Sequence, residues 1–291
     1  MRKSKPRPLM ISRKIDRRQF LESGLAAAAL AAAGRLPLLA ADTESGSGID
    51  ASAGPHAVKP VRSLLPRFSP ADPRTEQGHY ALTYNIIHWS GATSAVALPP
   101  NPVIGSITIK RTPARDSVLY EVNQQTRIGG VHNMIEAQIT CRTDDLNSLK
   151  SWNVRFYHDN QARQTDPLSL IQEKGTCRNG KISVGSRDSK YGFAAKRPVL
   201  TQWTLLNYLI HRATPATRVD FDLLQDLSLF KPAQNLFYDG PVCLKLKGDE
   251  TVTLHSYAQI GEGILPIHYL LDDHRRPQLV TAGLISWALA G

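Results

Sequence analysis

Near its middle the chain reads Ile135-Glu136-Ala137-Gln138-Ile139-Thr140-Cys141-Arg142, with apolar and polar side chains in strict alternation. The same period of two returns in residues 152–157 (Trp-Asn-Val-Arg-Phe-Tyr) and 242–247 (Val-Cys-Leu-Lys-Leu-Lys). Such alternation predicts strands with one buried and one solvated face. It favours an antiparallel sheet over a parallel sheet that is buried on both faces.

Turn residues predict where neighbouring strands are joined. Asn179-Gly180, between Arg178 and Lys181, is a strong signal for a two-residue hairpin. A second hairpin is expected over 272–277 (Asp-Asp-His-Arg-Arg-Pro). With these, the sequence predicts about ten strands, the others lying near 79–89, 103–111, 117–125, 251–260, 263–271 and 279–286.

Helical periodicity is clearest after Thr201, which can cap a helix whose apolar positions are Leu205, Leu206, Leu209 and Ile210. A second short helix is expected over 221–230, ending before Pro232. The expected fold is therefore mainly β: a curved antiparallel sheet or half-barrel with one or two covering helices.

The net charge of +10 suggests nucleic-acid binding until its distribution is considered. Residues 1–41 hold nine basic and two acidic side chains, whereas the rest of the chain holds 26 and 23. A nearly balanced remainder gives no electrostatic reason to bind phosphate backbones, so nucleic acid is not expected as a partner. No apolar run approaches the ~20 residues that a membrane span needs, so no transmembrane segment is expected in the mature protein.

The N-terminal segment 1–41 has the layout of a signal peptide: a basic start, a short apolar stretch over 25–33, and small residues at its end. Within it, Arg17-Arg18-Gln19-Phe20-Leu21 resembles the twin-arginine (Tat) export motif of bacteria, although Asp16 replaces the usual Ser or Thr. The resemblance implies export of the folded protein by the Tat translocase, to the periplasm or beyond. It does not by itself imply a cofactor, and none is expected.

Residues 42–78 are rich in Ser, Gly, Ala and Pro and keep neither period, so a flexible linker is expected there. The folded domain is then expected to cover 79–291. Its order of pieces resembles uncharacterised exported bacterial proteins, a family of unknown function built on an antiparallel half-barrel similar to the lipoprotein-carrier fold. The matching pieces are Ile104-Gly105, the 149–152 strand, the Asn-Gly hairpin, 198–206 and the closing hairpin from Gly261 to Asp273. This resemblance implies an apolar ligand between sheet and helix and supplies no catalytic residues.

The search for catalytic motifs finds neither a GxSxG elbow nor HExxH, a Walker loop or paired CxxC. The densest set of metal-ligand types is His268, Asp272, Asp273 and His274, which also reads as a solvated turn, and no metal site is expected. If the protein is an enzyme, His268 and Asp272 are the expected acid–base pair.

Three cysteines permit at most one internal disulfide, and Cys141 with Cys177 is the candidate pair because both lie near strand ends. Cys243 would need a base such as His255 to act as a nucleophile. Of the four tryptophans, Trp203 on the covering helix is the candidate for ligand binding, with core packing as the alternative.

Three functions follow as hypotheses. The first is an exported envelope protein that binds an apolar or amphipathic ligand, such as a lipid, or a partner segment, without catalysis. The second is an envelope hydrolase or carbohydrate-active enzyme that uses a His/Asp pair. The third is a structural or assembly protein that pairs through an exposed strand edge.

Overall fold

The computed structural model describes residues 78–88, 103–128, 131–159, 169–187, 189–245 and 251–290. The signal segment with Arg17, Arg18, Phe20 and Leu21, nearly all of the expected linker, and Trp89 lie outside these described residues.

Fifteen strands form one sheet in the order β8-β7-β6-β5-β4-β3-β2-β1-β15-β14-β13-β12-β11-β10-β9. The first eight are β1 (Tyr80–His88), β2 (Val103–Ala114), β3 (Ser117–Ile128), β4 (Val131–Cys141), β5 (Leu149–Asp159), β6 (Ile171–Arg178), β7 (Lys181–Ser186) and β8 (Lys190–Ala194). The others are β9 (Val199–Leu200), β10 (Arg218–Gln225), β11 (Leu229–Lys245), β12 (Thr251–Ile260), β13 (Ile267–Leu271), β14 (Pro277–Ala282) and β15 (Ile285–Leu289). Neighbouring strands are antiparallel except β9 and β10. The predicted mainly β, antiparallel class is confirmed, but the prediction of about ten strands was too low.

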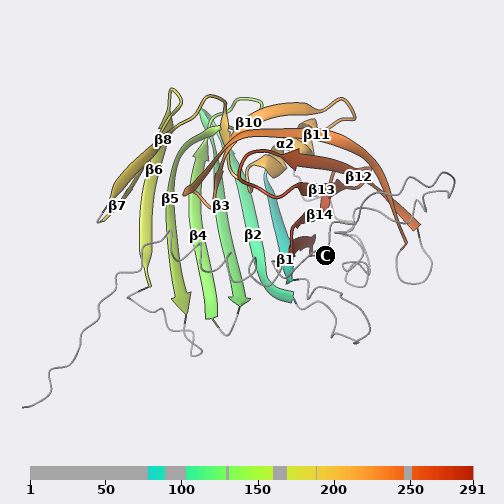
Figure 1. Cartoon of the computed structure of the whole chain (residues 1–291), viewed down its shortest axis with the longest axis horizontal. Coiled ribbons are helices and arrows are strands. Elements are labelled where there is room, and N and C mark those ends of the chain that lie inside the picture. Colours follow the sequence, from blue (N-terminus) through green and yellow to red (C-terminus); the bar gives the residue numbers. More distant parts are fainter. Residues whose placement is uncertain are drawn as a thin grey trace, which may run out of the picture. The chain divides into compact units, whose positions relative to one another are not determined.

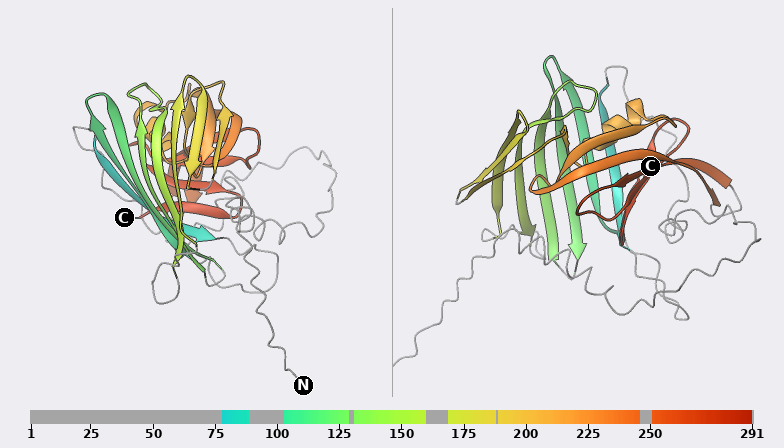
Figure 2. Two further views of the ribbon diagram at one scale, coloured as in Figure 1. Left: turned by 90° about the vertical axis from the view of Figure 1, so that its left-hand side faces the viewer. Right: turned by 45° about the horizontal axis from the view of Figure 1, so that its top comes forward.

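The sheet is open and strongly curved (Figures 1 and 2). Strands β1–β8 stand side by side as one wall, and β10–β13 cross in front of it. The two edges, β8 and β9, are not paired with each other. Near them the two halves meet through side chains, since the rings of Phe193 on β8 and Phe230 on β11 stack with centroids 5.3 Å apart.

The wall follows the alternation that the sequence predicts. On β1 the side chains of Tyr80, Leu82, Tyr84 and Ile86 are 0–4% exposed, whereas the residues between them are exposed. The inward side chains of β1–β7 join one hydrophobic core with those of α2 and β9–β14. The outward face of the wall therefore remains available to solvent.

One helix, α2 (Leu205–Arg212), lies in the hollow of the described sheet (Figure 1). Its predicted apolar positions are confirmed, because Leu205, Leu206, Leu209 and Ile210 are at most 1% exposed. The cap residue is Thr204 rather than Thr201, whose hydroxyl instead accepts a hydrogen bond from the Thr204 backbone N–H at 3.1 Å. No helix in the described residues is long and apolar enough to cross a membrane.

The helix predicted over 221–230 is wrong: residues 221–225 belong to β10, 226–228 form a turn, and 229–230 begin β11. A register shift places two residues of β11, Pro232 and Ala233, opposite Asp222 of β10. Phe221, Leu223 and Leu224 are all buried in the core, so this part of β10 lacks the alternation of a half-solvated strand and its apolar spacing imitates a helix. The Asp222 carboxylate accepts hydrogen bonds from the backbone N–H groups of 196, 197 and 233 at 2.9–3.1 Å, which holds the irregular strand in place.

Both predicted hairpins form. Arg178 pairs with Lys181 across Asn179-Gly180, and the 272–277 turn joins β13 to β14. The predicted strand at 279–286 is instead two strands, because the chain turns at Gly283, which has φ +55°.

Strands β13 and β14 are buried on both faces. Tyr269 and Val280 face the core, whereas their neighbours Leu270 and Leu279 lie on the opposite face and are 0% exposed. The apolar second face continues to Leu254 on β12 and to Ala288 on β15. This part of the sheet differs from the half-solvated wall of β1–β8.

Candidate functional site

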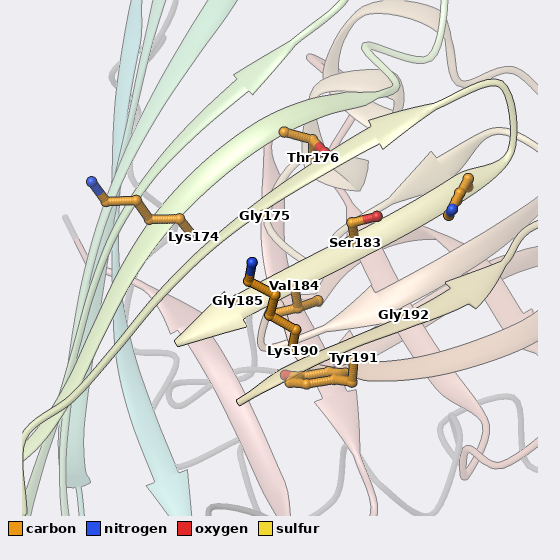
Figure 3. A pocket seen from close by; sticks show the side chains of 10 residues that line it. Lys174, Gly175, Thr176, Ser183, Val184, Gly185, Lys190, Tyr191 and Gly192 are labelled. Atoms are coloured by element: carbon orange, nitrogen blue, oxygen red, sulfur yellow. The ribbon is translucent and has the colours of Figure 1, made fainter. Parts of the chain in front are cut away.

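A shallow depression lies on the outward face of β6, β7 and β8, with a volume of about 560 Å³ (Figure 3). Its cationic lining residues are Lys174, Lys181 and Lys190, and its hydroxyl residues are Thr176 and Ser183. We call it the lysine depression. The sheet register places its side chains in rows: Lys174, Gly185 and Lys190 face one another across three strands, and Thr176, Ser183 and Gly192 form the next row.

Glycines make the depression hollow. Gly185 stands between the two lysines of its row, so the floor there is bare backbone (Figure 3). A Cβ added at Gly185 would meet only Lys190 Cγ, at 3.9 Å, which is ordinary contact distance. Gly192 is a tighter position, because a Cβ there would lie 2.4 Å from the carbonyl oxygen of Ile182.

The described lining of the depression carries no negative charge. The nearest acid on its strands, Glu173, is on the opposite face, 4% exposed, and accepts a hydrogen bond from Tyr191 Oη at 3.2 Å. The ammonium groups are exposed and free to turn toward a ligand. Lysines and hydroxyls around bare backbone can bind a carboxylate or phosphate by charge and hydrogen bonding, and the described lining places no histidine or carboxylate beside the hydroxyls.

The sequence analysis did not predict this site. The available signal is the segment 172–192, in which basic residues and glycines recur and whose strand positions alternate. Period two assigns Lys174, Lys181 and Lys190 to outward positions. Only the pairing register of β6, β7 and β8 shows that these three lysines lie on one part of the sheet.

Trp203, the predicted ligand-binding residue, is 0% exposed and part of the hydrophobic core. Leu206, Leu209 and Phe221, also 0% exposed, belong to the same core. Trp203 comes just before α2 rather than on it, and it does not line the lysine depression.

The predicted disulfide does not form, and all three cysteines are free thiols. Cys141 is on β4 and Cys177 on β6, with β5 between them. Two strand spacings separate their backbones by about 10 Å, beyond the ~7 Å limit for a disulfide. Burial raises the pKa of both thiols, which makes them unreactive. Cys243 pairs with Thr253, its Sγ 3.7 Å from Thr253 Oγ1.

His268 and Asp272 are not brought together as an acid–base pair. His268 Nδ1 lies 3.5 Å from Asp239 Oδ2. The Asp272 carboxylate instead accepts hydrogen bonds from the backbone N–H groups of 274 and 276, from Arg276 Nε at 2.6 Å and from Gln278 Nε2 at 2.7 Å. Asp272 is thus occupied in fixing its turn.

A different His/Asp pair has the connectivity of a proton relay. His255 Nδ1 lies 3.2 Å from Tyr238 Oη, and its Nε2 lies 3.1 Å from Asp273 Oδ1. Because two different ring nitrogens are used, a neutral imidazole can donate to the carboxylate while it accepts from the phenol.

Among the described residues, no group of three or more His, Cys, Asp or Glu side chains is arranged to hold a metal ion.

Comparison with known proteins yields no family model, no curated protein and no solved structure that matches this chain.

Proposed function

We propose that this chain is a non-catalytic binding protein of the bacterial envelope, exported by the Tat translocase, and that its ligand is amphipathic with an anionic group. The lysine depression is the observation that carries this proposal. Three lysines and the hydroxyls of Thr176 and Ser183 line a depression with a glycine floor, and the described lining holds no compensating carboxylate. Its volume of about 560 Å³ lies within the ~300–1,000 Å³ usual for ligand sites.

Analogy with carriers that have a lipoprotein-carrier-like half-barrel also supports a ligand-binding function. The feature that supports the analogy is the open curved sheet with α2 in its hollow (Figure 1). In carriers of that shape the ligand lies between sheet and helix, whereas here that space around Trp203 holds buried side chains. We therefore place the ligand on the outward face of β6–β8.

The export step rests on Arg17 and Arg18 in the signal segment. Replacing both arginines by lysine is expected to retain the chain in the cytoplasm, as measured by fractionation of its own host. Unchanged export would remove the Tat translocase from the proposal.

Ligand binding is tested by native mass spectrometry of the processed protein, purified from its host without detergent. We expect an added mass that is released when the protein is denatured. The Gly185→Leu variant should lose it, because its side chain fills the depression without a backbone clash. Gly185→Ala is the matched control and should keep part of the ligand. A wild-type protein without added mass, or an added mass that Gly185→Leu retains, would overturn the site.

A second candidate function, an envelope hydrolase, is favoured by the Tyr238–His255–Asp273 arrangement. In it His255 is the base and Asp273 orients the imidazole. Hydrolysis of ester or glycoside substrates by the wild type, lost in His255→Asn and Asp273→Asn but kept in His268→Asn, would support this function over simple binding.

The third hypothesis, assembly through a strand edge, finds less support. In the described residues the edges are β8, with five residues, and β9, with two. Short edge strands are a common way to prevent edge-to-edge pairing.

A further inference from the structure

The outward face around the lysine depression carries a longer pattern of side chains. Thr140 pairs with Ser151, Ser151 with Thr176, Thr176 with Ser183, and Ser183 with Gly192. We call Thr140, Ser151, Thr176 and Ser183 the hydroxyl row. It crosses β4, β5, β6 and β7 at right angles to the strands and ends at Gly192 on β8. With strands about 4.8 Å apart, the row and its glycine end span about 19 Å.

Cations flank the hydroxyl row on both sides. The row on one side contains Gln138, Asn153, Lys174, Gly185 and Lys190. The row on the other side contains Arg178 and Lys181, which pair across the β6–β7 turn. These three rows hold four basic side chains and no acidic one on β4–β8. Two carboxylates border these rows. Glu121, exposed on β3, pairs with Gln138 at the end of one row. Glu136 on β4 is bonded to Arg155 at 2.9 Å and to Tyr157 at 2.7 Å.

We propose that this face binds a linear acidic polysaccharide, which lies along the hydroxyl row and places its anionic groups against the flanking lysines and Arg178. The inference rests on the site of the proposed function, and it assigns the anionic groups of the ligand to a sugar polymer rather than to a lipid. Hydroxyl and amide side chains exchange hydrogen bonds with sugar hydroxyls, and ammonium and guanidinium groups bind carboxylates or phosphates. A row about 19 Å long suits several sugar units better than one small molecule.

Single-stranded nucleic acid is a poorer fit for the same charges. Proteins that bind single strands stack the bases on aromatic side chains. The three rows contain no aromatic residue. Tyr191 also lines the depression, but its ring, like that of Phe193, alternates with the outward residues of β8 and packs against the core. A face of hydroxyls, amides and cations selects sugars instead.

The test measures binding of the full chain to soluble polymers by isothermal titration calorimetry. The probes are polygalacturonate as the acidic polysaccharide, dextran as the neutral one, and polyglutamate as a polyanion without sugar hydroxyls. We expect polygalacturonate to bind most tightly. The double variant Thr176→Val/Ser183→Ala should bind it about tenfold less tightly through loss of two hydrogen bonds. The double variant Lys174→Ala/Lys190→Ala should lose at least as much affinity for polygalacturonate.

Lys110→Ala is the charge-matched control, because Lys110 is exposed on β2 and is separated from Gln138, the end of its row, by the acidic Glu121 on β3; it should bind like the wild type. Urea denaturation confirms that each variant is folded. Equal binding of polygalacturonate and polyglutamate, unaffected by loss of the two hydroxyls, would overturn the inference. Binding of anionic lipid vesicles but not of polygalacturonate would also overturn it, while leaving the proposed function intact. Failure of all probes, together with a bare mass in native mass spectrometry, would remove both.

Discussion

At the scale of single residues, Gly175 shows how one missing side chain shapes the core. It is on the inward face of β6, directly opposite Trp152 on β5. A Cβ there would lie 2.0 Å from Trp152 Cζ2, so the absence of a side chain is what lets the indole lie against the strand. Gly175→Ala must therefore displace a tryptophan that is 3% exposed.

We expect Gly175→Ala to lower the free energy of unfolding by about 1–3 kcal/mol, as overpacking usually does. Urea denaturation measures the change. Gly185→Ala is the matched control on the adjacent strand, where the new methyl meets only Lys190 Cγ; it should leave stability equal or raise it by up to ~1 kcal/mol. If both variants were equally stable, the close packing of Trp152 against Gly175 would be contradicted.

Two hairpin turns show which residues the sequence can predict. Asn179 and Gly180 both have positive φ, as their types favour, so this turn was predicted correctly. The β10–β11 turn places Asp226 and Leu227 at φ +49° and +59°, and a positive φ is not expected for leucine. Gln202, 24 positions earlier, holds it by accepting from the Asp226 N–H and donating to Oδ1. Such distant support cannot be seen in a local pattern.

At the scale of elements, β14 departs from simple alternation because it is buried on both faces. We expect Leu279→Ala to cost about 2–5 kcal/mol, although Leu279 lies outside the hydrophobic core beneath α2. Val280→Ala, on the core face, should be similarly costly. Chemical denaturation compares them with Asn123→Ala on the exposed face of β3, which should cost less than about 0.5 kcal/mol. A loss that small for Leu279→Ala would mean that the second face is solvated.

Elements also limit how far the candidate site could be predicted. Alternation assigns Lys174, Lys181 and Lys190 to outward positions, and the Asn-Gly turn fixes the β6–β7 register. The row that joins Lys174 to Lys190 also needs β8, an edge strand of five residues that was not among the predicted strands. Local patterns therefore predict the part of the site on β6 and β7. The part on β8 depends on the pairing of an edge strand, which a local pattern does not show.

At the scale of the whole molecule, four buried tyrosines make stability depend on alkaline pH. Burial raises the pKa of Tyr80, Tyr84, Tyr120 and Tyr269 above its ordinary value. Below pH ~10 these phenols are protonated in both states, and their contribution to stability is complete. Above it the unfolded chain releases protons that the folded chain keeps, so the free energy of unfolding falls by up to ~1.4 kcal/mol per tyrosine and pH unit.

We therefore expect one cooperative transition above pH ~10 in which circular dichroism and tyrosinate absorbance change together. Tyr157, half-exposed and raised to a pKa of about 12 by partial burial and by Glu136, is not in this group. Ionisation of the four buried phenols while the sheet remains intact would contradict their burial.

The order of strands also determines when the molecule can be complete. β15 pairs with β1 on one side and β14 on the other, so residues 285–289 join the wall of β1–β8 to the strands β9–β14. Tyr84 meets Leu289, 205 positions later, so the sheet cannot be completed until residue 289 has been synthesised.

Deleting 285–291 should leave β1 and β14 as unpaired edges, abolish the cooperative urea transition, and stop export of the folded protein. The measurements are circular dichroism of the purified variant and fractionation of its host. Deleting residues 43–50, in the expected linker, is the control and should preserve both. A truncated chain that unfolds but is exported normally would argue against the Tat route, because that route carries folded proteins; one that folds normally would argue against β15 as the join between the two halves.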